Sequence, residues 1–156
     1  MNSTGFPDRH RTLGALLRRP YEILAAWLYA ELARQGFPEL RASHSAVFRT
    51  IAPEGSRVSE LARRAGLTKQ SMAYLVEQLV EWGYAEIEPD SEDRRAKRVR
   101  LTARGEAAQH RALALSSECE ARLAERLGQK EMRQLRRLLE RLYEQLESEL
   151  TPPPAP

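Results

Sequence analysis

The stretch from Gly66 to Gly105 reads GLTKQSMAYLVEQLVEWGYAEIEPDSEDRRAKRVRLTARG. Its beginning is typical of the second half of a helix-turn-helix, where a glycine turn leads into a longer helix that Thr68 is expected to cap. Its end is basic, because six positive side chains and no negative one lie between Arg94 and Arg104. The question is whether the helix and the basic segment serve one nucleic-acid surface.

The residues before this stretch complete the helix-turn-helix pattern. Ser59 is expected to cap a short helix, and Ala62 and Gly66 provide the small residue and the flexible turn that two crossing helices need. The second helix is expected to bury one stripe, made of Leu67, Met72, Leu75, Val76 and Leu79. The opposite face carries Lys69, Gln70, Ala73, Tyr74 and Glu77. A plain packing pair of helices can show the same spacing, so this motif alone does not establish DNA binding.

A β-hairpin is predicted directly after these helices. Residues 84–88 and 97–101 alternate polar and apolar side chains, and the segment PDSEDRRA between them is rich in turn formers. Asp93 stands beside Arg94 and Arg95 and can hold a long side chain extended. The alternative is a solvated loop without a function. A helix-turn-helix followed at once by a basic hairpin indicates a winged helix, in which the loop reaches phosphates or the minor groove.

Long helices are predicted on both sides of the winged helix. The first begins at Thr12 and ends at Gly36, with a break or kink at Pro20, and a second follows over about 39–51. Two further helices, 103–127 and 129–150, are separated by Gly128, and a proline-rich tail, 151–156, is expected to be disordered. Leucine stripes on the first and last helices are wider than one winged helix can cover, which favours a dimer. The alternative is a bundle in which these helices pack only on each other.

Composition narrows the class of protein. A chain of 156 residues with a net charge of +3 suits one domain, and any affinity for DNA must come from local clustering of charge. Neither a signal peptide nor a stretch of membrane-spanning length is evident, so a cytoplasmic location is expected. The sequence has no phosphate-binding glycine loop or nucleophile elbow, and its three histidines lack metal-site spacing. We therefore expect no enzyme, cofactor or metal.

The segment DRRAKRVRLTARG resembles the wing signature of the MarR family of bacterial transcription regulators. The matching positions are Asp93, Arg95, Val99, Leu101, Thr102 and Gly105. The segment VSELARRAGLTKQSMAYLVEQLVEWGY is similar to the helix-turn-helix of the same family, and the order of elements agrees from Leu13 to Leu150. The fold predicted is mainly α with a small β-hairpin wing: a winged helix-turn-helix with N- and C-terminal dimerisation helices.

The resemblance implies a homodimer that binds double-stranded DNA at an approximate palindrome. Residues 1–36 and 103–150 would form the dimer, and residues 37–102 would bind DNA, with the wing at about 84–101. Arg95 would enter the minor groove with Asp93 as its positioning partner, and Arg94 and Lys97 would contact phosphates. The residues expected at or near the major groove are Lys69, Gln70, Ser71 and Tyr74.

The resemblance also implies a repressor released by a small, mostly apolar or aromatic effector. Trp27, Tyr29 and His44 are the candidate ligand residues, although His44 also fits a plain surface or core-edge position. An oxidant sensor acting through Cys119 is an alternative, but Glu118 and Glu120 disfavour the thiolate it needs, so a buried, inert cysteine is expected. A further alternative is a winged helix that binds proteins and not DNA.

Overall fold

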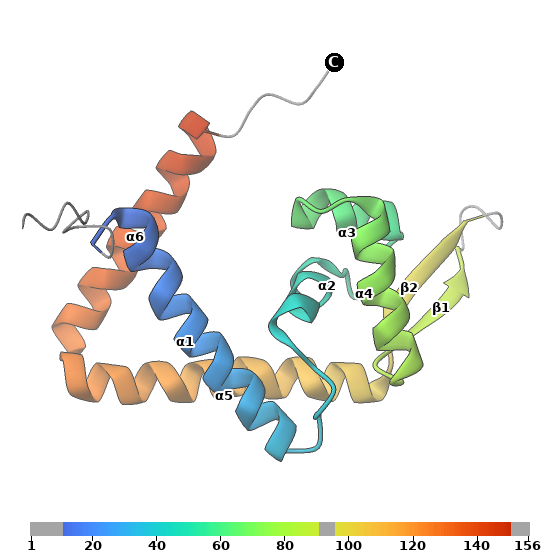
Figure 1. Cartoon of the computed structure of the whole chain (residues 1–156), viewed down its shortest axis with the longest axis horizontal. Coiled ribbons are helices and arrows are strands. Elements are labelled where there is room, and N and C mark those ends of the chain that lie inside the picture. The colour runs from blue at the N-terminus through green and yellow to red at the C-terminus, as the bar shows by residue number, and fades with distance from the viewer. Residues whose placement is uncertain (1–10, 91–95, 151–156) are drawn as a thin grey trace, which may run out of the picture. The chain divides into compact units, whose positions relative to one another are not determined.

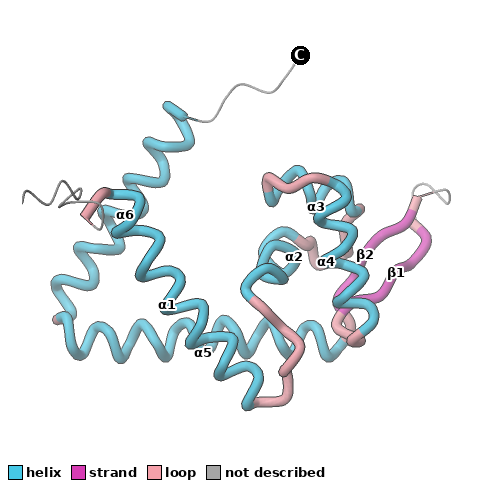
Figure 2. Tube along the Cα trace, viewed as in Figure 1, coloured by secondary structure: helices cyan, strands magenta, loops and turns pink. Residues whose placement is uncertain are grey.

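The computed structural model describes residues 11–90 and 96–150 (Figures 1 and 2). The chain divides into two compact units, residues 1–115 and residues 116–156. The elements are α1 (Leu13–Arg34), a 3-10 turn η1 (Ala42–His44), α2 (Ser45–Thr50), α3 (Val58–Ala65), α4 (Lys69–Glu81), β1 (Ala85–Pro89), β2 (Lys97–Leu101), α5 (Ala103–Leu127) and α6 (Gln129–Leu150). The prediction of a mainly helical protein with one antiparallel hairpin is confirmed.

The turn between α3 and α4 has the geometry that the sequence predicted. Gly66 adopts the left-handed conformation at φ 65°, and the Leu67 N–H donates to the Ala62 carbonyl at 2.9 Å. This arrangement satisfies carbonyls at the end of α3 and favours a residue without a Cβ. The Thr68 hydroxyl then accepts the Ser71 N–H at 3.1 Å, which caps α4.

Two details of the predicted helix-turn-helix are wrong. Helix α3 begins at Val58 with Arg57 in the N-cap position, and Ser59 is an exposed residue inside the helix. The Glu60 carboxylate accepts the Arg57 N–H at 3.1 Å, so Glu60 supplies the capping bond that was expected of Ser59. Leu67 lies in the turn and is 39% exposed, because the buried stripe begins only with Met72, inside α4.

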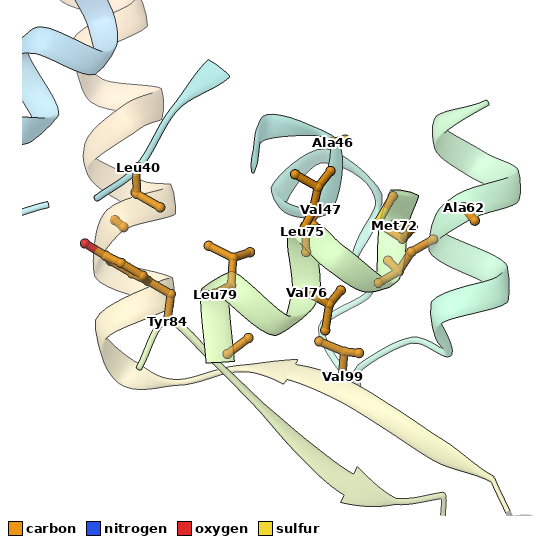
Figure 3. Close-up of a cluster of buried hydrophobic side chains, with 13 residues drawn as sticks. Leu40, Ala46, Val47, Ala62, Met72, Leu75, Val76, Leu79, Tyr84 and Val99 are labelled. Carbon is orange, nitrogen blue, oxygen red and sulfur yellow. The ribbon is translucent and has the colours of Figure 1, made fainter. Parts of the chain in front are cut away.

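The core of the first unit surrounds α4 (Figure 3). Met72, Leu75, Val76 and Leu79 of α4 are buried. They pack in one cluster with residues from the neighbouring elements, among them Leu40, Ala46, Val47, Leu61, Ala62, Tyr84 and Val99. Because α4 is packed on one face only, its other face is fixed in place and open to solvent.

The hairpin is joined to the rest of the first unit at its base. In β1–β2 Ile87 pairs with Val99, and Ser56 adds a bridge to Val99 with hydrogen bonds of 3.0 and 2.9 Å. The first strand starts one residue later than predicted, since Tyr84 is fully buried against the core. Strand β2 has the predicted bounds.

The last two residues of the wing signature close this base. The Thr102 hydroxyl donates to the Gly83 carbonyl at 2.6 Å and accepts the Gly105 N–H at 3.1 Å. A Cβ at Gly105 would lie 2.0 Å from the Tyr84 carbonyl oxygen, so the close approach of α5 to this backbone requires glycine. Thr102 and Gly105 therefore have structural roles.

In the first half of the chain, the break predicted as one alternative at Pro20 and the bounds of the second helix need correction. Helix α1 runs through Pro20 without a break, and Pro20 is exposed, so water can solvate the carbonyl that its missing N–H leaves unpaired. The second helix is shorter than 39–51, because Arg41 is extended at φ −134°, ψ 164° and its N–H donates to the His44 ring. Residues 35–41 therefore form a linker between α1 and η1, and the predicted helical residues 39–41 belong to it.

The second unit consists of the end of α5 and of α6. Both helices have the predicted bounds, and Gly128 between them has φ 106°. Within this unit an ion pair joins Arg136 to Glu120. Cys119 is half-buried, where a buried side chain was expected. Across the described parts of both units, no helix is long and apolar enough to cross a membrane.

Candidate nucleic-acid interface

The first two turns of α4 present a polar surface. Lys69, Gln70 and Ser71 are exposed, and Tyr74 is 61% exposed one turn further on. The Thr68 cap orders the first turn, and the N-terminal end of a helix carries partial positive charge. This surface combines hydrogen-bonding side chains, one cation and a rigid support, which is what a helix needs to enter a DNA groove.

A chain of hydrogen bonds leads from the interior to this surface. The buried His44 ring accepts the Arg41 N–H at Nδ1 (2.9 Å), and its Nε2 lies 3.1 Å from Gln78 Oε1. Gln78 Nε2 donates to the Tyr74 hydroxyl at 3.3 Å, and the His44 ring packs edge-on against Trp82. Helical spacing alone does not single out Gln78, because its role depends on the turn that brings His44 against α4.

A buried carboxylate holds the base of the wing. Asp90 follows β1 directly, and its Oδ2 accepts Arg57 Nε at 2.7 Å and Arg98 Nε at 3.0 Å. Arg98 also donates to the Gly55 carbonyl at 3.2 Å. This cluster ties the start of α3 to both strands. No sequence signal separates Asp90 from the other acidic residues of the turn-rich segment.

The basic stretch is not one uniform surface. Arg98 points to Asp90, Arg100 forms an exposed pair with Glu88 at 3.5 Å, and Arg104 lies on α5 against Glu39. Lys97 is exposed on β2. Three more residues, Asp93, Arg94 and Arg95, fall outside the described residues. Intramolecular contacts thus account for three of the six positive charges.

Arg104 belongs to a cluster that fixes the linker after α1. Its guanidinium lies 4.2 Å from the centroid of the Tyr84 ring, and its Nη2 is 3.2 Å from Glu39 Oε2. The Tyr84 hydroxyl donates to Glu39 at 2.6 Å, and this bond lowers the pKa of Glu39. Burial, followed by the same hydrogen bond, raises the pKa of Tyr84. The cluster joins the linker, the start of the hairpin and α5.

Two hollows of similar volume lie beside the linker. The first, of about 610 Å³, is lined by His44, Tyr74, Gln78 and Trp82 together with linker residues. The second, of about 590 Å³, is lined by α1 and the linker and includes Tyr29. Burial raises the pKa of Tyr29, and a hydrogen bond with Ser45 partly offsets this. Tyr29 and His44 thus border different hollows, and Trp27 is half-buried on α1 and borders neither.

Among residues 11–90 and 96–150, no group of three or more histidine, cysteine, aspartate or glutamate side chains is arranged to hold a metal ion. The arrangement described above is a polar surface backed by a packed core, with a hairpin anchored beside it.

Comparison with known proteins places this geometry in a family. The MarR family profile matches residues 39–96, whereas no curated protein sequence matches significantly. Among solved structures, the reduced form of MarR from E. coli is 20% identical over 84% of this chain and 96% of its own, with a TM-score of 0.72. A probable transcriptional regulator from Pseudomonas aeruginosa is 26% identical over 85% and 97%, with a TM-score of 0.65.

A third structure has higher sequence identity. The Mycobacterium tuberculosis MarR family protein Rv2887, in complex with salicylic acid, is 32% identical over 84% of this chain and 96% of its own, with a TM-score of 0.62. This identity over more than four fifths of each protein, together with the profile match, shows that the chain belongs to the MarR family, whose members are transcription regulators and not enzymes.

Proposed function

We propose that the protein is a dimeric, sequence-specific DNA-binding regulator in which α4 reads the major groove. The observation that carries the proposal is the exposed polar face of α4 over a fully packed opposite face. Lys69 would contact a phosphate, and Gln70, Ser71 and Tyr74 would lie near base edges. Gln70 can bond an adenine edge in two places, which supports discrimination between bases.

The wing adds the second set of contacts in this proposal. Lys97 is exposed on β2 and, with Arg94, would neutralise phosphates. Arg95, positioned by Asp93, would enter the minor groove, which holds a guanidinium best where it is narrow. The Asp90 cluster supports this assignment, because it fixes the point from which the loop departs.

Dimerisation is proposed through residues 1–36 and 103–150, with residues 37–102 as the DNA-binding part. Helix α1 exposes Leu13, Leu16, Leu17 and Leu24, and α6, in the other unit, exposes Leu135, Leu138, Leu139 and Leu146. So many exposed leucines favour a covered interface. A second copy of the chain is the proposed partner. The twofold symmetry of such a dimer would require an approximately palindromic operator. The proposed location is the cytoplasm, where bacterial DNA lies.

Repression is proposed to end when a small, mostly apolar or aromatic molecule binds. The related protein Rv2887 was solved with salicylic acid, and two hollows here border the linker between α1 and η1. A ligand acts only through its different affinity for the two states, so it must bind the DNA-free form more tightly. Salicylate should raise the unfolding temperature and weaken operator binding, and Tyr29→Ala should reduce both effects if the hollow beside α1 is the site.

The DNA contacts can be tested separately by substitution. Gln70→Ala should weaken operator binding by about 1–3 kcal/mol and change binding to unrelated DNA much less, because base contacts discriminate. Lys97→Ala should weaken binding to all DNA and lower the salt slope by about one, because phosphate contacts act uniformly. Equal losses on operator and unrelated DNA for Gln70→Ala would exclude α4 as the reading helix.

The role of the wing has its own test. Arg95→Ala should weaken binding most on operators with A·T-rich flanks, where the minor groove is narrow. Affinity measured against flank sequence and salt distinguishes this from a phosphate contact. An unchanged affinity for Arg95→Ala on every flank would remove the wing arginine from the mechanism.

A further inference from the structure

The hydrogen bonds that end at Tyr74 determine which way its hydroxyl faces. His44 is 2% exposed, and its Nδ1 accepts the Arg41 N–H, so the neutral ring carries its proton on Nε2. That proton is donated to Gln78 Oε1, which fixes the orientation of the Gln78 amide. The Gln78 Nε2 group therefore faces the Tyr74 oxygen as a donor.

The Tyr74 oxygen is thus the acceptor in this chain, and its own proton is directed away from Gln78. The ring is 61% exposed on the same face as Lys69, Gln70 and Ser71. In the major groove, acceptors are guanine N7 and O6, adenine N7 and thymine O4, whereas cytosine presents an amino donor. An outward hydroxyl proton suits the acceptors and does not suit cytosine.

The hollow beside Tyr74 explains why a tether, meaning the hydrogen bonds from His44 through Gln78 to Tyr74, would affect DNA binding. The hollow of about 610 Å³ is lined on one side by Tyr74, Gln78 and Trp82, so the exposed ring has space in which to take another rotamer. Fixing a side chain before binding reduces the entropy lost when the complex forms. The tether begins at a buried ring that packs against Trp82 with centroids 5.3 Å apart, and it is therefore anchored in the fold.

We propose that His44 and Gln78 are positioning residues that hold the Tyr74 hydroxyl as a hydrogen-bond donor toward an acceptor on a base edge. The inference rests on the proposed function, since it requires that α4 enters the major groove. It adds two specificity-determining residues that do not touch DNA themselves.

The test is a double-mutant cycle on DNA binding. Wild type, Gln78→Met, Tyr74→Phe and the double variant are compared on the operator, obtained by selection from random DNA, and on a scrambled duplex. Each single substitution should weaken operator binding about fivefold, the value of one net hydrogen bond. The double variant should be no weaker than Tyr74→Phe, and binding to scrambled DNA should stay unchanged.

Gln109→Met is the matched control. Gln109 on α5 donates to the Phe48 carbonyl at 2.8 Å, so this variant loses a glutamine hydrogen bond away from the proposed reading face, whereas Gln78→Met loses two. It should lower the unfolding temperature no more than Gln78→Met does and leave operator affinity unchanged. Thermal unfolding of each variant confirms that the protein measured is folded.

A second readout is the base preference itself. Selection with Tyr74→Phe and with Gln78→Met should relax the preference at one and the same position of each half-site. The proposal is overturned if Gln78→Met weakens binding equally in the wild-type and Tyr74→Phe backgrounds, or weakens operator and scrambled DNA alike. If the wild-type protein selects a sequence but the cycle shows no coupling between Gln78 and Tyr74, only this inference fails. If wild type selects no sequence at all, the proposed function fails and the inference falls with it.

Discussion

Thr102 and Gly105 illustrate how single residues of a family signature can be explained by geometry. Thr102 links the end of the hairpin to the first turn of α5, and Gly105 lies where the Tyr84 carbonyl leaves no space for a side chain. Both residues belong to the wing signature that resembles the family. The structure supplies the physical reason that they stand there.

Replacement of this glycine should destabilise the protein. In Gly105→Ala the new methyl group would overlap a backbone oxygen, so we expect a loss of about 2 kcal/mol or more in the free energy of unfolding. Gly14→Ala in α1 is the control, because nothing lies within 4 Å of its added Cβ, and it should be neutral or stabilising by up to about 1 kcal/mol. Urea unfolding gives the free energy of unfolding of both variants. Equal values for Gly105→Ala and Gly14→Ala would contradict the close approach of Gly105 to the Tyr84 carbonyl.

Glu39 should make stability depend on acid. The Tyr84 hydroxyl, with smaller contributions from a backbone hydrogen bond of Glu39 and from Arg104, lowers the pKa of Glu39 in the folded protein below its usual value of 4.5. A depressed folded pKa contributes stability that is present above the unfolded pKa and is lost as pH falls through the folded one. The stability difference between wild type and Glu39→Gln should therefore shrink below about pH 4.5. A difference that stays constant from pH 6 to pH 3 would contradict this assignment.

The wing depends on Asp90, which no sequence pattern distinguishes from its acidic neighbours. The buried Asp90 carboxylate accepts hydrogen bonds from Arg57 and Arg98, whose side chains are 35% and 18% exposed. Because both arginine side chains are partly exposed, water screens these ion pairs and reduces their contribution to stability. We therefore expect Asp90→Asn to lower the free energy of unfolding by roughly 2 kcal/mol. Glu88→Gln, which removes an exposed pair with Arg100, should change it by about 0.5 kcal/mol or less.

Hydrogen exchange shows which part of the protein Asp90→Asn destabilises. The Val99 and Ser56 amides bridge the hairpin to the segment before α3, and they should exchange faster in Asp90→Asn than in Glu88→Gln. If both variants unfold at the same urea concentration and exchange alike, Asp90 does not anchor the wing.

Local patterns predicted the long elements well and the linkers poorly. Strand β2, α5 and α6 have the predicted bounds, because alternation or a capping residue and a terminal glycine mark them in the sequence. Residues 39–41 were predicted as helix, since the contacts of Glu39 with Tyr84 and Arg104 come from distant parts of the chain. The bond from the Arg41 N–H to the His44 ring is local, but no helical spacing predicts it.

The same reason explains what was missed around the proposed interface. Lys69, Gln70, Ser71 and Tyr74 were chosen by helical spacing, and all four are exposed on α4. Gln78 and Asp90 act through residues that are 34 and 33 positions away in the sequence. No spacing rule identifies such pairs before the fold is known.

At the scale of the whole molecule, the proposed dimer accounts for the exposed leucines. The double variant Leu135→Asp, Leu139→Asp would place two charges on the exposed apolar stripe of α6. This variant should be monomeric at micromolar concentration. Arg137→Asp introduces the same side chain two residues away from each leucine and should leave the dimer intact. Sedimentation velocity gives the mass of each variant. A wild-type chain that is folded and monomeric at these concentrations would contradict the proposal.

Selection of bound sequences from random DNA by the purified wild-type protein measures whether α4 of a symmetric dimer reads a defined operator. Two α4 helices in a symmetric dimer should select an approximate palindrome, with half-site centres about one helical turn, or roughly 34–36 Å, apart. Gln70→Ala in the same selection should lose preference within both half-sites equally. Enrichment of no sequence, or of a single site without symmetry, would contradict the account.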